Sequence, residues 1–294
     1  MMIENPVYFD WPPIVVDDGA LYHYTKFESF IEIIRTMTLR SSSLSKMNDL
    51  NEASIEFIDK SKDFLFLYKT AKYIKNNCSI ICFTKNYTKG DFIELGGNHP
   101  AMWAHYAEDS NGVCLVLDEK ALMEKNKDLL AHYFHKIEDV TYCHNCSPDD
   151  SIVKKEYCSV SDFIQKNYKE LFFKKHEDWS YEKETRLLIE SPKISINIKG
   201  AIKYIILGGR MKNDEVKVKT IIDLMISPGS ATYKYFLPLS FAQVSLSPFG
   251  YSIDIASYII YDQLKRMSLT MPLAKAYLDW CDQNGNLLED QDYE

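Results

Sequence analysis

Two acidic side chains stand close together late in the chain, in Trp179-x-Tyr181-Glu182-Lys183-Glu184-x-Arg186. Glu184 is predicted to begin a strand that runs to Ile189, and side chains along a strand alternate with a period of two. Glu182, Glu184 and Arg186 would then share one face, and Arg186 is predicted to form an ion pair that supports the site. Paired carboxylates can stabilise positive charge that develops in a reaction. The alternative is a solvated charged turn, which is the usual setting of such residues.

A histidine lies between two aromatic residues early in the chain, in Tyr22-His23-Tyr24-Thr25. Its imidazole can donate or accept a hydrogen bond, and an aromatic neighbour can stack on a planar ring. Apolar residues at helical spacing follow from Phe27 to Met37, so the segment is predicted to be a strand that leads into a helix. The alternative is a core histidine satisfied by a backbone carbonyl.

A second aromatic set is predicted on a short helix over 101–107. Trp103 and Tyr106 are three residues apart and therefore share one helical face, with His105 on another. The glycine-rich segment 87–100 before them is predicted to be a loop. An aromatic face beside such a loop suits a planar ring. The alternative is a packed helix with Trp103 in the core.

Arg40 is followed by Ser41 and Ser42 in a strand predicted over 39–44. A guanidinium in this position could hold a diphosphate group. The alternative is an ordinary surface arginine.

Two patterns with metal-binding chemistry were compared with these. His132-x2-His135 followed by Cys143-x2-Cys146 offers four ligands of the kinds that zinc prefers. A predicted strand continues through Cys143, however, so we expect no metal.

Asp118-x-Lys120 ends a buried strand, with Glu108 upstream, and this arrangement is compatible with a metal-dependent nuclease. No P-loop, G-x-G-x-x-G, H-E-x-x-H or G-x-S-x-G motif is present.

The elements that must position these groups mix strands and helices, so the fold class is predicted to be α+β. Strands are expected over 20–25, 39–44, 78–84, 112–118, 185–190 (with Glu184 at its start) and 201–207, and a strand pair over 133–142. Helices are expected over 27–37, 52–74, 101–107, 119–129, 150–176, 214–225, 253–267 and 272–283. Proline and glycine after Ser227 favour an arm at 1–19, a domain at 20–226 and a C-terminal helical extension with an acidic tail at 227–294.

Charge and cysteine content narrow the functional class. The chain of 294 residues has a net charge of −8, and six acids with no Lys or Arg lie in 279–294. The body is thus nearly neutral and lacks the basic excess of typical nucleic-acid-binding proteins, although a local basic patch would be hidden in the sum. Seven cysteines, an odd number, and no apolar leader or membrane span predict reduced thiols in the cytoplasm, without a membrane.

The motifs, taken in order, resemble the family catalogued as domain of unknown function 2971, over roughly residues 20–226. The resemblance rests on Leu21–Thr25, Asn48-Asp49 with Glu52, Cys82–Thr84, Met102–Ala107, Gly112–Leu115, Trp179–Arg186 and Ile205–Gly208. That family is distantly similar to ADP-ribosyltransferases, including toxins that act on DNA. The resemblance implies a bent, split, mixed β core of ADP-ribosyltransferase type, flanked by helices, with NAD held in a cleft.

The resemblance also implies roles for single residues. Glu184 would hold the ribose hydroxyls of NAD and stabilise the oxocarbenium-like charge as the nicotinamide leaves, and Glu182 would act near the acceptor. Catalysis would also involve His23 and Tyr106. NAD binding would involve Tyr22, His23, Tyr24, Thr25, Arg40, Ser41, Trp103, Tyr106 and Glu184.

The activity so implied is transfer of ADP-ribose from NAD to a macromolecule, with RNA or DNA favoured over protein. Such an enzyme would be a toxin or a phage-defence effector, and an antitoxin or chaperone could be its partner. The alternatives are a metal-dependent nuclease and a non-catalytic interaction protein of a defence or toxin–antitoxin system.

Overall fold

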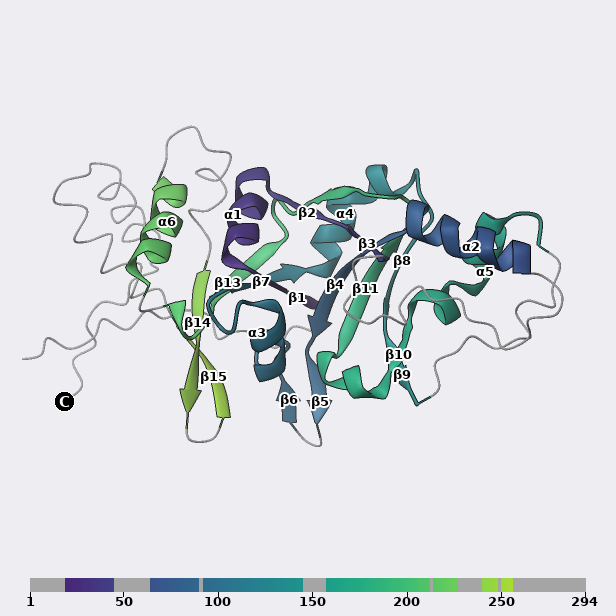
Figure 1. The fold of residues 1–294 in the computed structure, drawn as a ribbon. Coiled ribbons are helices and arrows are strands. Elements are labelled where there is room, and N and C mark those ends of the chain that lie inside the picture. Colours follow the sequence, from purple (N-terminus) through teal and green to yellow (C-terminus); the bar gives the residue numbers. More distant parts are fainter. Residues whose placement is uncertain are drawn as a thin grey trace, which may run out of the picture. The chain divides into compact units, whose positions relative to one another are not determined.

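Figure 1 shows the protein as a computed structural model. The structure describes residues 19–44, 64–89, 92–144, 157–211, 214–226, 240–247 and 250–255. The chain forms two compact units, and each is assembled from separate stretches of sequence. Unit 1 draws on 1–37, 86–118 and 199–294, and unit 2 draws on 38–85 and 119–198. The domain boundaries expected at 19/20 and 226/227 remain a prediction.

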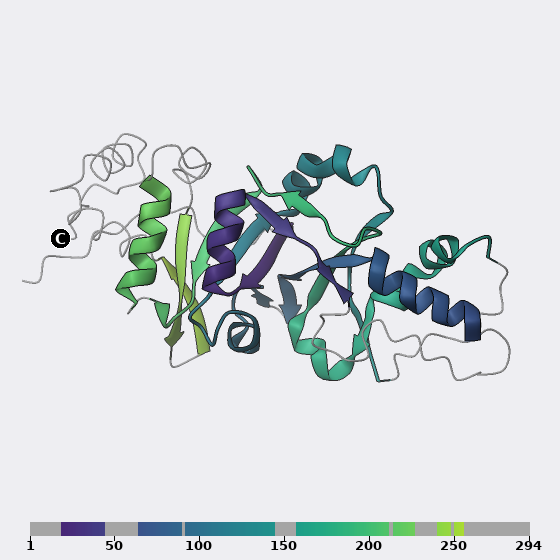
Figure 2. The same cartoon turned by 45° about the horizontal axis from the view of Figure 1, so that its top comes forward.

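Unit 1 is built on a five-stranded stretch of sheet in the order β15-β14-β13-β7-β1. Its strands are β1 (Ala20–Thr25), β7 (Val113–Asp118), β13 (Ile202–Leu207), β14 (Ser240–Ser247) and β15 (Gly250–Ile255). Neighbouring strands are antiparallel except for β13 and β14, which are parallel. Helix α3 (Pro100–Tyr106) contacts β1, and α1 (Phe27–Thr36) contacts α6 (Glu215–Ile226), as Figure 2 shows. A short hairpin of β5 (Tyr87–Lys89) and β6 (Phe92–Glu94) precedes α3.

Unit 2 has β11 (Glu184–Ile189) between β4 (Ser79–Lys85) and β8 (His135–Asp139), all antiparallel, with β3 (Ser42–Ser43) on β4. Two smaller pairs are β2 (Thr38–Arg40) with β12 (Ser195–Asn197), and β9 (Thr141–Cys143) with β10 (Lys174–His176). The helices are α2 (Phe64–Asn77), α4 (Glu119–Leu130), α5 (Val160–Phe172) and the 3-10 helix η3 (Glu177–Glu182).

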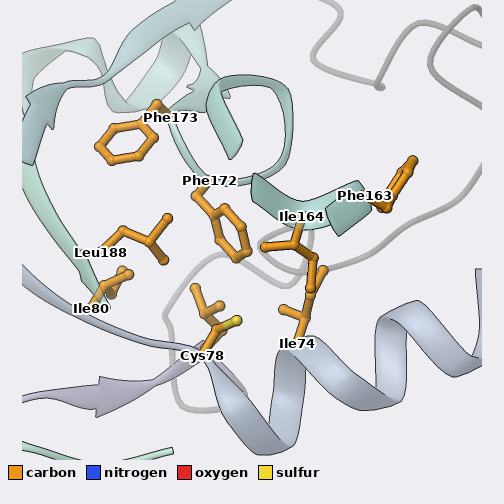
Figure 3. Packing of buried hydrophobic residues seen from close by; sticks show 9 residues of the cluster. Ile74, Cys78, Ile80, Phe163, Ile164, Phe172, Phe173 and Leu188 are labelled. Atoms are coloured by element: carbon orange, nitrogen blue, oxygen red, sulfur yellow. The ribbon is translucent and has the colours of Figure 1, made fainter. Parts of the chain in front are cut away.

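The apolar core of unit 2 lies where α2 and α5 meet the sheet. Leu188 of β11 and Ile80 of β4 pack there with Ile74, Ile164 and Phe172 from the helices (Figure 3). All six residues of β11 are buried. Of its apolar second half, Leu188 belongs to this core, and Leu187 and Ile189 are buried as well. The polar first half, Glu184–Arg186, is also buried, so its charged side chains must find partners.

The predicted α+β class is confirmed, and most expected elements form close to their expected bounds. Three expectations were wrong. The segment 87–100 contains the β5–β6 hairpin, the end of the helix expected over 150–176 is β10, and Ile253–Ile255 belongs to β15 rather than to a helix. Strands of three residues, such as β5, β6 and β10, are too short to show a clear alternating pattern, and β10 pairs with the distant β9. The remaining C-terminal extension and the acidic tail lie outside the described residues.

Cysteine pairing also differs from expectation. Cys143 is disulfide-bonded, whereas Cys78, Cys82, Cys114 and Cys158 are free. An odd cysteine count does not prevent one bridge, because bridging depends on the separation of the two Cα atoms. None of the helices in the described ranges is long and apolar enough to cross a membrane.

Candidate active site: a buried carboxylate cluster

Glu184, the first residue of β11, forms a bidentate ion pair with Arg186, two residues later on the same strand. The Glu184 oxygens accept hydrogen bonds from Arg186 Nε at 2.7 Å and from its second terminal nitrogen at 2.8 Å. The remaining guanidinium nitrogen donates to the carbonyl of Phe172 at 2.7 Å. Residues two apart on a strand lie on one face, so the predicted Glu184–Arg186 ion pair is confirmed.

A lysine from β10 completes the cluster. Lys175 Nζ lies 2.6 Å from Glu182 Oε2 and 3.4 Å from Glu184 Oε2, and it also sits 4.7 Å from the centre of the Trp179 ring. The side chains of Lys175, Glu182, Glu184 and Arg186 are each at most 6% exposed. Two acids and two bases are therefore buried together with balanced charge, which is the condition for burying charge at acceptable cost.

Glu182 reaches the cluster by a route that strand alternation did not predict. It ends η3, and Lys183 after it has left-handed backbone angles, φ 46° and ψ 48°, that turn the chain into β11. Its carbonyl accepts a hydrogen bond from Thr84 Oγ1 at 3.0 Å. The interpretation of this segment as a solvated charged turn is thus wrong, because both glutamates are buried.

The environment keeps Glu184 ionised. Burial alone raises the pKa of this carboxyl, but the charge and hydrogen bonds of Arg186, the Lys175 charge and a hydrogen bond from Cys82 outweigh burial and lower the pKa to about 2. Its backbone N–H donates to the Tyr142 hydroxyl at 2.9 Å, and burial raises the pKa of Tyr142. Glu184 is therefore a fixed, negative group at neutral pH.

In unit 1, the early aromatic strand and the short helix jointly hold a glycine loop. Tyr24 donates from its hydroxyl to the carbonyl of Gly96 at 2.7 Å, and the Trp103 indole N–H donates to the carbonyl of Gly97 at 2.8 Å. The two rings meet edge to face at 5.1 Å. Trp103 is fully buried, so its ring supports the loop from behind and has no surface open for stacking in this structure.

The other residues of unit 1 that were predicted to bind NAD differ in how far they are exposed. Tyr22 and Thr25 are buried, at 2% and 7% exposed. His23 is the one residue of β1 that is not buried, and Tyr106 at the end of α3 is also partly exposed. His23 and Tyr106 are therefore the members of this set with surface available for contact with a ligand.

Arg40 and Ser41 lie in unit 2 but away from the carboxylates. Ser41 Oγ accepts hydrogen bonds from Ser79 Oγ and from the backbone N–H of Ile194, and Ser41 is buried. Ser79 pairs with Ile189 at the opposite end of β11 from Glu184, which is about 17 Å along the strand. Ser41 thus joins strands, whereas Arg40 is exposed.

The positions of Glu108 and Asp118 do not fit the metal-dependent nuclease alternative. Glu108 accepts a hydrogen bond from the backbone N–H of Phe27, near the Val113 end of β7, whereas Asp118 at the other end pairs with Lys203 at 3.1 Å. These carboxylates stand about 16 Å apart along the strand and cannot share a metal ion. Among the described residues, no group of three His, Cys, Asp or Glu side chains is arranged to hold a metal. Of the possible zinc set, Cys146 lies outside the described residues, so the expectation that no zinc binds stays a prediction.

Sequence reasoning missed two members of the cluster, Lys175 and Tyr142. Lys175 was placed within a predicted helix, and nothing in its sequence neighbourhood distinguishes it from the adjacent Lys174, which pairs with Glu170 near the surface. A possible signal was the surplus of acid in Glu182-x-Glu184, which a single Arg186 cannot balance.

Comparison with known proteins gives two findings. Residues 102–187 match the model of a family described as "Protein of unknown function (DUF2971)", which confirms the predicted family resemblance over those residues. A solved structure, DarT of Thermus sp. 2.9 in complex with ADP-ribosylated ssDNA, aligns at 8% identity over 69% of this chain and 88% of that chain, with a TM-score of 0.26. A TM-score this low carries no argument about fold or activity. No curated protein sequence matches the chain.

Proposed function

We propose that this protein transfers ADP-ribose from NAD to a nucleic acid, with Glu184 as the carboxylate that faces the reacting ribose. The observation that carries the proposal is the buried cluster in which Arg186 and Lys175 keep Glu184 ionised and fixed. A carboxylate in a low-dielectric setting stabilises an oxocarbenium-like centre far better than one in water.

The contacts within the cluster suggest how the ribose would be held. Arg186 binds Glu184 at 2.7 and 2.8 Å, but Lys175 lies 3.4 Å away from it and closer to Glu182. The long Lys175 contact is the one that a ribose hydroxyl would replace, leaving Lys175 on Glu182. Because the cluster is buried in this structure, the residues that cover it would have to move when NAD binds. In unit 1, His23 and Tyr106 have partly exposed surface, and their part in NAD binding remains a prediction.

In the transfer step, the bond between the ribose C1′ and the nicotinamide nitrogen breaks, and nicotinamide leaves with the bonding electrons. A nucleophilic atom of the acceptor then forms the new bond to C1′ and loses its proton. Glu182, the second carboxylate of the cluster, would take that proton.

The test is incubation of the full-length protein with NAD labelled in the adenosine part and a cell lysate, followed by nuclease or protease. Label released by nuclease would support the proposal. Label released only by protease would show that the acceptor is a protein. The absence of both transferred label and free nicotinamide would refute the activity and leave the alternative of a non-catalytic interaction protein.

The residue assignment has its own test. Glu184→Gln should reduce transfer by about 100-fold or more, because Gln has the same shape without the charge. The matched control is Glu177→Gln, an exposed acid of the adjoining η3 that should keep wild-type activity. Circular dichroism must show both variants folded. Wild-type turnover in Glu184→Gln would move the role to Glu182.

A further inference from the structure

Helix α2 of unit 2 has one outer face on which basic side chains gather without acids. Its sequence, Phe64–Asn77, contains three lysines and neither Asp nor Glu. The chain as a whole has a net charge of −8. The helix therefore forms a local positive patch that the overall charge conceals.

Helical spacing places this patch on a single surface. At about 100° per residue, Leu65, Tyr68, Lys69, Lys72, Lys75 and Asn76 fall within an arc of about 120°. All six are exposed, whereas the opposite side carries the buried Thr70 and Ile74. Ile74 belongs to the core in Figure 3, and α2 contacts α5, beside which Figure 1 shows it. We call these six residues the outer face of α2.

Two properties separate the outer face from an ordinary solvated helix. Within the described ranges, Lys69, Lys72 and Lys75 form no ion pair, although lysines on α4 and α5 pair with acids such as Glu124 and Asp162. Leu65 and Tyr68 are also 64% and 57% exposed. Large side chains this exposed, beside lysines that have no acidic partner among the described residues, favour a binding surface.

We propose that the outer face of α2 binds single-stranded nucleic acid. Phosphates complement the three ammonium groups, and the Tyr68 ring offers a stacking surface for a base, which is the combination that such sites use. Two apolar side chains are few for insertion into a lipid surface.

The position of the outer face of α2 fits a nucleic-acid strand that is bound both there and at the carboxylate cluster. Helix α2 leads into β4 at Ser79, which pairs with Ile189, the end of β11 farthest from Glu184. The face would therefore hold the strand at a distance from the carboxylate cluster, and in this respect it rests on the proposed function by giving the acceptor a docking surface.

The experiment measures the affinity of the full-length protein for a fluorescent single-stranded oligonucleotide as salt is varied. Three phosphate contacts predict a slope of log K against log salt of about −2, or about a 20-fold loss from 50 to 200 mM. The triple variant Lys69→Gln/Lys72→Gln/Lys75→Gln should abolish most of this slope. Tyr68→Ala should weaken binding about tenfold and leave the slope unchanged.

The matched control is Lys120→Gln/Lys125→Gln/Lys127→Gln on α4, which removes the same charge from a helix whose three lysines are balanced by three acids. It should bind like wild type. Equal losses in the two triple variants, or no binding by the wild-type protein at low salt, would overturn the proposal. Binding to vesicles that contain phosphatidylserine but not to the oligonucleotide would also overturn it, in favour of a membrane surface.

This test does not depend on catalysis. Salt-dependent binding that the α2 variant loses, in a protein that transfers no label from NAD, would refute the proposed function and leave the docking surface standing. Transfer to nucleic acid that the α2 variant retains, with unchanged oligonucleotide affinity, would refute the docking surface and support the proposed function.

Discussion

Replacing Lys175 with methionine should unbalance the buried cluster in a measurable way. Methionine keeps the length and apolar stem of lysine but removes the ammonium that contacts both Glu182 and Glu184. Arg186 would then be left to neutralise two carboxylates. Because both oxygens contact one nitrogen, at 2.6 and 3.4 Å, they lie within about 6 Å of each other.

The size of the effect follows from that distance. Two negative charges about 6 Å apart repel by about 3 kcal/mol at an effective dielectric constant of about 20. Removing one partner of a buried ion pair typically costs about 3–5 kcal/mol. We therefore expect Lys175→Met to lose about 3–5 kcal/mol of unfolding free energy at pH 7.

The loss should depend on pH with a definite sign. In the variant, one of the two carboxylates takes up a proton more readily in the folded than in the unfolded state, so its stability should rise as the pH falls from 7 toward 5. The assay is urea unfolding at several pH values. Lys174→Met, which removes the neighbouring lysine of a half-exposed pair with Glu170, should change stability by less than about 1 kcal/mol.

A second variant makes the argument refutable even if the first folds poorly. Lys175→Met combined with Glu182→Gln leaves Glu184 and Arg186 as a neutral pair and should recover most of the lost stability. If the double variant is as unstable as the single one, or if Lys175→Met matches wild type at every pH, the charge-balance reasoning is wrong.

Three further predictions test other parts of the structure. The pKa of Glu184 is lowered to about 2, so its ionised form stabilises the fold above pH 4.5. The free energy of unfolding should fall by about 3 kcal/mol as the pH falls from 4.5 to 2. In acid titrations, the stability of Glu184→Gln should depend less steeply on pH. A Cβ added at Gly208 would lie 2.2 Å from the Ser110 carbonyl oxygen, so Gly208→Ala should lower the melting temperature. It should do so more than Gly200→Ala, which has open space and only a positive φ to oppose it. Tyr24→Phe should cost about 1–3 kcal/mol in urea unfolding, because the buried Gly96 carbonyl loses its donor; equal stability would show that water replaces the hydroxyl.

Local patterns in the sequence determined much of the secondary structure. The aromatic, β-prone composition of Ala20–Thr25 predicted β1, and apolar residues at helical spacing predicted the start of α1 at Phe27, as the structure has them. The sequence also predicted Glu184 at the start of a strand and its pairing with Arg186, because both depend on neighbours two residues away.

Contacts between distant segments were decided only by the tertiary structure. Lys175 joins the cluster because β10 pairs with β9 and η3 returns the chain to β11, and no local rule connects these elements. Trp103 is fully buried rather than offered to a ligand, because Tyr24, 79 positions earlier, packs against it. Burial and charge compensation depend on which segments meet in space, and residue spacing along one segment cannot specify those meetings.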